Sequence, residues 1–331
     1  MHAIVCSQPG GTEVMQWTEV ADPIAGKGEV VVAVVAVGLN RADILQRKGF
    51  YPPPAGASEY LGLECSGVIA EVGPDVTDWK VGDEVCALLT GGGYAQKVAI
   101  PVGQLLRVPH NVSLIDSAAL PEVVATVWSN LAMLAHLREG ETLLIHGGTS
   151  GIGTMAIQIA RELGARIIVT CGTQAKVDAA LALGADHAIN YRESDFADEV
   201  KALTDGNGVD VILDVMGAKY LEPNVQSLAA NGRLVVIGLQ GGTKGELDLN
   251  RLLTKRAAVL ATSLRGRPVA EKAAIVDSVL EHVWPLIEQG TIKPVIDQRL
   301  PITKIAHAHD RMEASEHIGK IILTMTPADH V

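Results

Sequence analysis

The sequence predicts an α/β protein of two domains, one rich in β-strands and one built on a doubly wound parallel sheet of the Rossmann type. The chain has 331 residues, which is more than one ordinary hydrophobic core encloses. Short Val- and Ile-rich runs fill its first third, whereas beyond Pro121 strands alternate with helical segments. A Gly-rich turn also joins one of these later strands to a helix, as nucleotide-binding α/β domains require.

The first third contains four strand-like runs and one helix. The strands are expected at residues 29–37, 65–72, 83–88 and 96–100, separated by Gly, Pro and Asp. The helix is expected to begin at Asn40, a residue type that caps helices well, and to end at Gly49. This pattern predicts a β-rich domain with a single early helix.

The middle of the chain has the rhythm of a parallel sheet. Strands are expected at residues 142–146, 166–170, 209–214 and 233–237, each followed by a helical segment. From about Arg267 a long helix, a short strand and a final strand over 320–324 follow. This tail is too short to form a domain, so we expect it to complete the first one. The predicted domains are residues 1–120 with 267–331, and residues 121–266.

Composition argues against several classes of partner. The formal net charge is −11 and no Lys/Arg-rich block is present, so a nucleic-acid partner is not expected. The longest apolar run, residues 30–37, is too short to cross a membrane, and the first residues read as a strand, so no signal peptide is expected. The four cysteines are scattered in strand-like contexts without a CxxC pair, which predicts buried free thiols and a reducing, cytoplasmic compartment.

The strongest local motif is the Gly-rich turn. Residues 143–153 read LLIHGGTSGIG, and apolar residues then recur at helical spacing. Glycines let the backbone approach a pyrophosphate closely, and the new helix offers free N–H groups and its positive dipole end. A plain turn is the alternative, which the strand before and the helix after disfavour. The expected phosphate contacts are Gly148, Ser150, Gly151, Ile152 and Gly153.

The end of the next strand indicates which nucleotide binds. Folds that prefer NAD place an acidic residue there to hold the ribose 2′-hydroxyl. This strand continues into Gly172 and Thr173, and Lys176 follows, with no acid among them. A 2′-phosphate needs hydroxyl and ammonium donors, so we predict NADPH as the cofactor. Lys176 could otherwise be a solvated lysine at a helix start, and the missing acid decides against that reading.

Several segments together carry a family resemblance. They are Gly38–Asp43, Tyr51–Pro54, Leu61–Glu64, Gly91–Gly93 and Ile318–Ile321. With them the chain resembles, nearly end to end, the zinc-independent quinone oxidoreductase branch of the medium-chain dehydrogenase/reductase superfamily, and within it the p53-induced quinone oxidoreductase type. The resemblance implies a GroES-like catalytic domain built from both chain ends, with a Rossmann domain inserted between them.

The zinc ligands of the metal-dependent relatives are missing. Those relatives carry a Cys just before the first catalytic-domain helix and a His in a Gly-His-Glu triplet, where this chain has Asn40 and Leu63. Their third ligand, usually Cys, aligns near Glu122, and the link 88–94 replaces their four-cysteine lobe. A catalytic zinc needs about three protein ligands, so no metal is expected. His307 and His309, a close pair in the tail, are expected to decorate a helix surface.

The resemblance also implies cofactor contacts outside the Gly-rich turn. Thr126 would lie near the nicotinamide, and Tyr191 near the adenosine phosphate beside Lys176. Lys320 would reach the cofactor from the returning tail. Further contacts under the ribose and over the nicotinamide edge would come from Gly217, Gly238, Leu239, Gln240, Ser263, Leu264 and Arg265.

A small quinone is the expected acceptor, because it is already electron-poor and needs only a dry pocket and a few donors. The candidates for these donors are Tyr51, Asn40 and Asp43, although Tyr51 could instead stiffen its loop, Asn40 could cap its helix and Asp43 could be structural. Glu64 could orient the site. An NADPH-dependent enone or alkenal reductase is the alternative, and a nucleotide-binding structural or RNA-binding protein is the alternative of another class. A homodimer is expected through an edge strand at 257–262.

Overall fold

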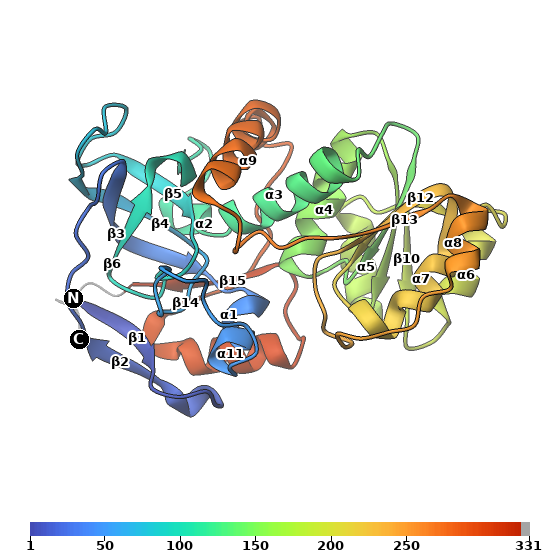
Figure 1. Cartoon of the computed structure of the whole chain (residues 1–331), viewed down its shortest axis with the longest axis horizontal. Helices are drawn as coiled ribbons and strands as arrows, with labels where there is room; N and C mark the ends of the chain where they lie inside the picture. The colour runs from blue at the N-terminus through green and yellow to red at the C-terminus, as the bar shows by residue number, and fades with distance from the viewer. Residues whose placement is uncertain (326–331) are drawn as a thin grey trace. The chain divides into compact units, whose positions relative to one another are not determined.

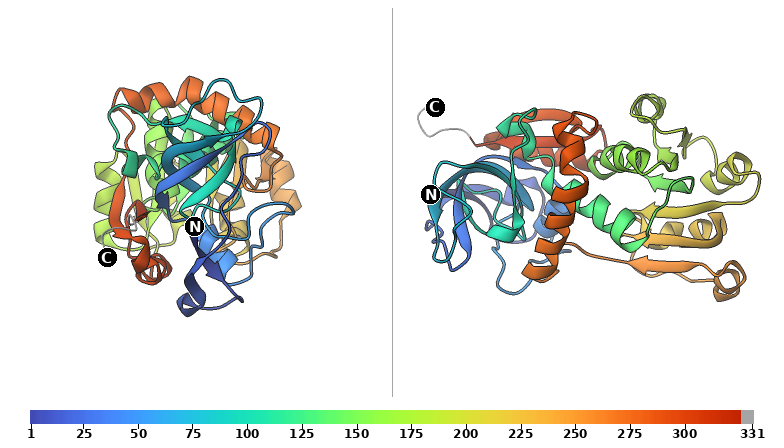
Figure 2. Two further views of the ribbon diagram at one scale, coloured as in Figure 1. Left: turned by 90° about the vertical axis from the view of Figure 1, so that its left-hand side faces the viewer. Right: turned by 90° about the horizontal axis from the view of Figure 1, so that it is seen from above.

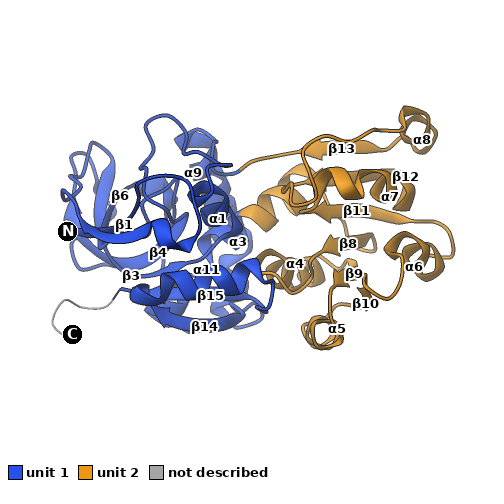
Figure 3. Ribbon diagram, turned by 90° about the horizontal axis from the view of Figure 1, so that it is seen from below, with its two compact units in different colours: residues 1–125, 264–331 blue, residues 126–263 orange. Residues whose placement is uncertain are grey.

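The computed structural model describes residues 1–325, and residues 326–331 of the predicted tail lie outside the described part. The chain forms two compact units (Figure 3). The first comprises residues 1–125 with 264–331, and the second comprises residues 126–263. The first unit therefore takes its residues from both ends of the chain. The predicted α/β class is confirmed, with a β-rich unit and a unit of alternating strands and helices.

The second unit is a parallel sheet in the doubly wound order. Its strands are β8 (Thr142–His146), β9 (Arg166–Cys171), β10 (His187–Asn190), β11 (Val209–Asp214), β12 (Leu228–Val236) and β13 (Ala258–Ala261). They lie in the order β10-β9-β8-β11-β12-β13, so the chain reverses direction across the sheet between β8 and β11. Ligands bind at such a reversal, outside the carboxyl ends of the strands.

Helices connect the strands of the second unit (Figure 1). They are α4 (Gly151–Glu162), α5 (Gln174–Ala182), α6 (Phe196–Leu203), η4 (Gly217–Tyr220), α7 (Leu221–Ser227) and α8 (Leu249–Lys255). The core beneath them contains Leu144, Ile168 and Ile212 from neighbouring strands, none of which is exposed to solvent. Strands buried on both faces are apolar along their length, which explains the continuous Val/Ile/Leu runs in this part of the sequence.

The first unit is built on a sheet of seven strands. Its order is β14-β15-β3-β4-β5-β7, and β6 also pairs with β3. The bounds are β3 (Glu29–Gly38), β4 (Glu64–Val72), β5 (Glu84–Leu88), β6 (Lys97–Pro101), β7 (Leu105–Arg107), β14 (Ile296–Pro301) and β15 (Lys320–Thr324). The antiparallel pair β15–β3 sets Ile322 opposite Gly38, so the chain's tail is part of this sheet. A separate hairpin joins β1 (His2–Cys6) to β2 (Met15–Glu19).

Helices and short turns complete the first unit. They are η1 (Thr12–Val14), α1 (Arg41–Arg47), η2 (Val102–Gln104), α2 (Leu114–Ser117), α9 (Val269–His282), α10 (Trp284–Glu288), η5 (Ile302–Lys304) and α11 (Ile305–Glu313). The helix α3 (Pro121–Trp128) begins in the first unit and ends in the second, where the π-helical turn η3 (Ser129–Leu134) follows it. The long helix α9, orange in Figure 2, packs against η2.

Most predicted elements are present, with some shifts at their ends. The bounds of β8, β11 and β15 agree with the sequence prediction, whereas β12 begins earlier, at Leu228. Cys65, Cys86 and Cys171 are buried free thiols as predicted, and Cys6 is only partly buried. Among the described residues no helix is long and apolar enough to span a membrane.

Candidate functional site

Glycines shape the turn after β8. Gly147 has a φ of +74°, a left-handed conformation that glycine adopts without steric cost. A Cβ on Gly148 would lie 2.6 Å from Cβ of Val169 in β9, and one on Gly153 would lie 2.3 Å from the carbonyl oxygen of Gly147. Strand, turn and α4 are therefore packed at backbone distance, which is the geometry of a dinucleotide-binding turn.

The first turn of α4 presents open N–H groups. Ser150 caps the helix, because its Oγ accepts a hydrogen bond from the N–H of Gly153 at 3.0 Å. The N–H groups of Gly151 and Ile152 have no acceptor within residues 1–325. Together with the positive end of the helix dipole, such groups form an anion site. The predicted turn residues thus fit a pyrophosphate.

The corner after β9 is lined by neutral and cationic groups. A Cβ on Gly172 would come within 2.5 Å of the Tyr191 hydroxyl, so this glycine leaves room for the phenol. Thr173 caps α5, and its Oγ1 accepts from the N–H of Lys176 at 3.3 Å. Lys176 is half-buried. Burial raises the pKa of the Cys171 thiol to about 11, and the nearby Lys176 ammonium acts to lower it. The predicted residues Gly172, Thr173, Lys176 and Tyr191 therefore lie together.

The loops that follow β11 and β12 are held together by backbone hydrogen bonds. The N–H of Gln240 donates to the carbonyl of Val215 at 3.2 Å. The buried Asp214 carboxylate anchors the first loop by accepting the N–H of Gly217 at 2.9 Å. Burial raises the pKa of Asp214 to about 6. Because both loops leave the carboxyl end of the sheet, Gly217, Gly238, Leu239 and Gln240 gather at the edge where the Gly-rich turn lies.

An amide that sequence reasoning missed ties Thr126 to the end of β13. Asn130 is buried, and its Nδ2 donates to the carbonyl of Thr126 at 2.8 Å. Its Oδ1 accepts from the hydroxyl of Thr262 at 2.6 Å, and Ser263 is the next residue. Asn130 lies in the π-helical turn, a feature that recurs at functional sites. Sequence patterns give no signal for such a turn.

In the first unit, Asp43 acts as an anchor for α1. Its Oδ2 accepts from the N–H of Asn40 at 2.8 Å and from the Tyr94 hydroxyl at 3.1 Å. Its Oδ1 accepts from the N–H of Gly62 at 3.0 Å. Burial raises the pKa of Asp43 to about 6, and these hydrogen bonds act in the opposite direction. Both carboxylate oxygens are engaged, so the contacts favour the structural role.

Beside Asn40 lies a buried ion pair. Nζ of Lys320 is 2.6 Å from Oε1 of Glu64, and their side chains are 4% and 0% exposed. Lys320 also donates to the carbonyl of Leu39 at 2.9 Å and to Oδ1 of Asn40 at 2.8 Å. Nδ2 of Asn40 donates to the same Glu64 oxygen at 3.0 Å. An ammonium has three donors, and all three are used here. These contacts hold Lys320 within the first unit, and its contact with the cofactor stays a prediction.

Tyr51 lies in the loop after α1 beneath a guanidinium. Cζ of Arg265 is 5.3 Å from the centre of the Tyr51 ring. Nη1 of Arg265 donates to the Tyr51 carbonyl at 3.2 Å, and Nη2 donates to Oε1 of Gln46 at 2.7 Å. Nε donates to the carbonyl of Thr90 at 2.8 Å. These contacts give Arg265 a positioning role within the first unit, which the sequence did not reveal.

The prediction for the tail histidines is wrong for His309. Residues two apart on a helix point to different faces, and of the two histidines His307 is exposed whereas His309 is not. His309 is buried, with Nδ1 3.0 Å from Nη1 of Arg47. Burial and the Arg47 charge lower the pKa of His309 to about 3. Within the described part of the chain, no group of three or more His, Cys, Asp or Glu side chains could hold a metal ion.

Comparison with known proteins identifies the families that the two parts of the chain resemble. The alcohol dehydrogenase GroES-like domain family matches residues 26–110, and the zinc-binding dehydrogenase family matches residues 151–280. The 2-haloacrylate reductase of Burkholderia sp. is 31% identical over 327 residues, which cover 97% of this chain and 98% of that protein. The chain belongs to the medium-chain dehydrogenase/reductase superfamily. Its two matched segments correspond to the GroES-like domain and the dehydrogenase domain that these families describe.

Other members of the superfamily extend the comparison. The Escherichia coli quinone oxidoreductase, solved in complex with NADPH, superposes with a TM-score of 0.89 at 30% identity and covers 98% of this chain and 100% of that chain. A phenolphthiocerol synthesis polyketide synthase of Mycobacterium bovis is 35% identical over 319 residues. The match covers 94% of this chain and 14% of the synthase, so this chain is similar to one segment of a much longer enzyme.

The superfamily assignment confirms the resemblance at this level. The relation to the p53-induced quinone oxidoreductase type stays a prediction. The two groups of predicted residues are each gathered in one unit. The phosphate turn and the corner after β9 belong to the second unit, and Asn40, Asp43 and Tyr51 belong to the first.

Proposed function

We propose that the protein is an NADPH-dependent, zinc-independent reductase of an electron-poor acceptor, in the first place a small quinone. The observation that carries the proposal is the acid-free corner after β9, where Thr173 and Lys176 lie beside Gly172 and Tyr191. A carboxylate there would accept the ribose 2′-hydroxyl of NADH and repel a phosphate, whereas an ammonium and hydroxyls attract one. When bound, NADPH would supply the hydride.

The residues at the position where the metal-dependent relatives hold zinc do not fit a metal ion. Asn40 and Glu64 already surround the Lys320 ammonium, and the second oxygen of Glu64 accepts the N–H of Glu122 at 2.9 Å. The Lys320 ammonium thus occupies the oxygen lone pairs of Asn40 and Glu64 that a metal ion would need. A Cβ on Gly38 would lie 2.3 Å from Oε1 of Glu64, so the packing is tight around this carboxylate.

Zinc independence has a direct test. Protein purified without a chelator is expected to contain no stoichiometric zinc, because the Asn40–Glu64–Lys320 network leaves no site of three open ligands. Treatment with EDTA should leave NADPH oxidation unchanged. Elemental analysis and activity before and after EDTA check this. Stoichiometric metal whose removal abolishes activity would contradict the proposal.

Tyr51 is the residue we propose to position the acceptor. Its ring is held by the Arg265 guanidinium, and its loop is tied to α1 through the same side chain. A rigid phenol offers both a flat face for stacking and an O–H donor for the acceptor oxygen. As negative charge grows on that oxygen during reduction, a donor already in place stabilises it.

Replacing Tyr51 with Phe should lower the turnover number with quinones about tenfold, as expected for the loss of one hydrogen bond to a developing oxyanion. The fold and the affinity for NADPH should not change. Steady-state kinetics with a small benzoquinone and fluorescence titration with NADPH measure the two effects. If Tyr51→Phe and Tyr51→Ala both keep wild-type kinetics, Tyr51 only stiffens its loop.

Reduction of a conjugated double bond is the second candidate function. The relative that favours it is the 2-haloacrylate reductase, whose match covers 97% of this chain and 98% of that protein. A panel of quinones, alkenals, enones and aldehydes, each scored by NADPH oxidation, separates the two candidates. An RNA-binding role would instead appear as a gel shift at physiological salt without acceptor-dependent NADPH oxidation.

We also propose a homodimer in a reducing compartment such as the cytoplasm. The strand β13 forms one edge of the second unit's sheet, and an uncovered apolar edge favours pairing with another chain. On α8, Leu249 and Leu253 are 70% and 77% exposed. The four cysteines are unpaired, which supports a reducing environment. Sedimentation velocity measures the oligomeric state directly.

A further inference from the structure

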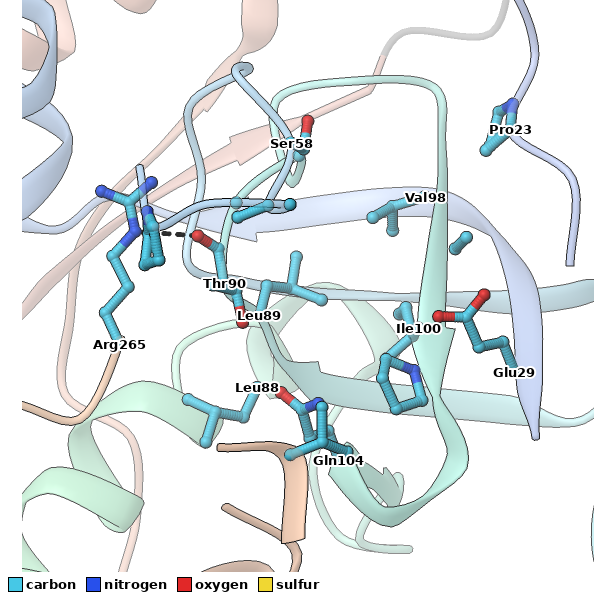
Figure 4. A pocket seen from close by; sticks show the side chains of 18 of the residues that line it. Pro23, Glu29, Ser58, Leu88, Leu89, Thr90, Val98, Ile100, Gln104 and Arg265 are labelled. Carbon is cyan, nitrogen blue, oxygen red and sulfur yellow. Dashed lines mark hydrogen bonds between the residues drawn. The ribbon is translucent and has the colours of Figure 1, made fainter. Parts of the chain in front are cut away.

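A solvent-open cavity of about 690 Å³ lies in the first unit. Its walls are the loop over residues 54–60, the end of β5 with the glycines after it, β6, and the start of α9 (Figure 4). Asn40, Asp43 and Tyr51 do not line it. Its volume is in the range of cavities that hold a small organic ligand. The reductase function proposed above makes no use of this space.

One side of the cavity carries a buried cation without a counter-ion. Lys272 on α9 lines the cavity and is 2% exposed. Its ammonium donates to the Thr90 hydroxyl, and no carboxylate pairs with it among the described residues. Arg265 lines the same cavity. Burial, and then the Arg265 charge, lower the pKa of Lys272 to about 8. A buried charge is costly unless a partner compensates it, so this end of the cavity favours an anion.

A buried amide lies in the same wall. Gln104 in η2 is 2% exposed and lines the cavity beside Leu88 (Figure 4). Its side chain has no hydrogen-bond partner within the part of the chain that the structure describes. Buried polar groups are nearly always paired in folded proteins. An unpaired amide facing a cavity is therefore available to a ligand's polar atoms.

One wall of the cavity is apolar. Leu88, Leu89, Val98 and Ile100 line it from β5 and β6. The Glu29 carboxylate lies on the side away from Arg265 in Figure 4, where its Oε2 accepts the N–H of Gly26 at 3.0 Å. Lys97 also lines the cavity, and its ammonium is already paired with Asp22. The lining thus suits a molecule with an apolar body and one anionic end.

We propose that this cavity binds an amphiphilic organic anion, with a carboxylate or phosphate group beside Lys272 and Arg265 and an apolar body along β5 and β6. The oxyanion would accept hydrogen bonds from the two unpaired N–H groups of the Lys272 ammonium. The Gln104 amide would bind a polar atom of the same ligand. This site shares Arg265 with the loop that holds Tyr51, but Lys272 and Gln104 belong to it alone, and the proposal does not depend on which acceptor the reductase site reduces.

The first test uses the wild-type full chain without cofactor. Isothermal titration with hexanoate and hexyl phosphate is compared with hexanol and hexylamine, which share the apolar body but lack the negative charge. At least one of the two anions should bind ten times more tightly than hexanol, and the tighter one identifies the head group. If neither anion binds more tightly than hexanol, the proposal is overturned.

Two variants locate the bound anion. Lys272→Met should weaken binding of the anion at least tenfold and leave hexanol binding unchanged. Gln104→Leu should also weaken binding of the anion, although it leaves the Lys272 and Arg265 side chains in place. The matched control is Lys27→Met, since the Lys27 side chain is 80% exposed and does not line the cavity. Thermal melting and NADPH titration monitor the fold. If Lys272→Met does not fold, the hexanoate–hexanol comparison in Gln104→Leu decides. The proposed site is overturned if every folded variant keeps the wild-type affinity for the anion. It is also overturned if a variant loses anion binding and NADPH binding to the same extent.

Discussion

Replacing Lys320 with Met should lower the free energy of unfolding by about 3–5 kcal/mol, the usual result of removing one partner of a buried ion pair. The Glu64 carboxylate is 0% exposed, so water cannot replace the lost ammonium. Nδ2 of Asn40 and the N–H of Glu122 would still donate to it. These two neutral donors do not supply the lost positive charge, and the uncompensated carboxylate is the source of the instability.

A double-mutant cycle separates the contribution of the Glu64–Lys320 ion pair to stability from the contribution of side-chain packing. Glu64→Leu alone should destabilise by a similar amount, because it leaves the Lys320 ammonium buried without a carboxylate. The double variant Glu64→Leu/Lys320→Met should be more stable than either single variant. Urea unfolding followed by tryptophan fluorescence measures this, since Trp17, Trp79 and Trp284 belong to the first unit.

The control is again Lys27→Met, whose side chain is 80% exposed. It pairs with Asp75 at the surface, and exposed pairs contribute about 1 kcal/mol or less. A loss of similar size for Lys320→Met and Lys27→Met would contradict the burial argument. So would strictly additive effects of Glu64→Leu and Lys320→Met, because independent sites do not couple.

Much of the second unit could be predicted from the sequence because its signals are local, although β10 was not among the predicted strands. The strand β8, the Gly-rich turn after it and the helix α4 are each encoded by residues that are neighbours in the sequence. The fit of Gly148 against Val169 and of Gly153 against Gly147 then follows from the motif itself. The missing acid after β9 was visible for the same reason. The contacts of Asn130 could not be predicted, because a π-helical turn has no sequence pattern.

The first unit was harder because its contacts join distant parts of the chain. Lys320 bonds to Asn40 across 280 residues, and no spacing rule relates them. The resemblance assigned Lys320 to the cofactor, whereas its three donors bind inside the unit. His309 was misplaced because the sequence does not show which face of α11 meets Arg47. The Lys272 cavity arises where α9 packs against η2, which only the tertiary structure brings together.

Lys176→Ala should weaken NADPH binding ten- to a hundredfold and leave NADH binding almost unchanged. The Lys176 ammonium lies in the first turn of α5, whose cap Thr173 forms the corner after β9. A charge-assisted contact with a 2′-phosphate in a partly screened site contributes about 1.5–3 kcal/mol, which is one to two decades of affinity. NADH has no phosphate there, so it loses nothing. Fluorescence titration with both cofactors measures the two affinities on the same protein sample.

Thr173→Asp tests the same corner by adding charge instead of removing it. Asp caps helices as well as Thr does, so α5 should keep its start while the corner gains the acid that NAD-preferring folds carry. NADPH affinity should fall at least as far as in Lys176→Ala, and NADH affinity should hold or rise. The control is Lys201→Ala, which removes an exposed lysine from α6. If wild type binds both cofactors equally, or if Lys176→Ala weakens both alike, Lys176 is a surface lysine, and the acid-free corner does not select the phosphate.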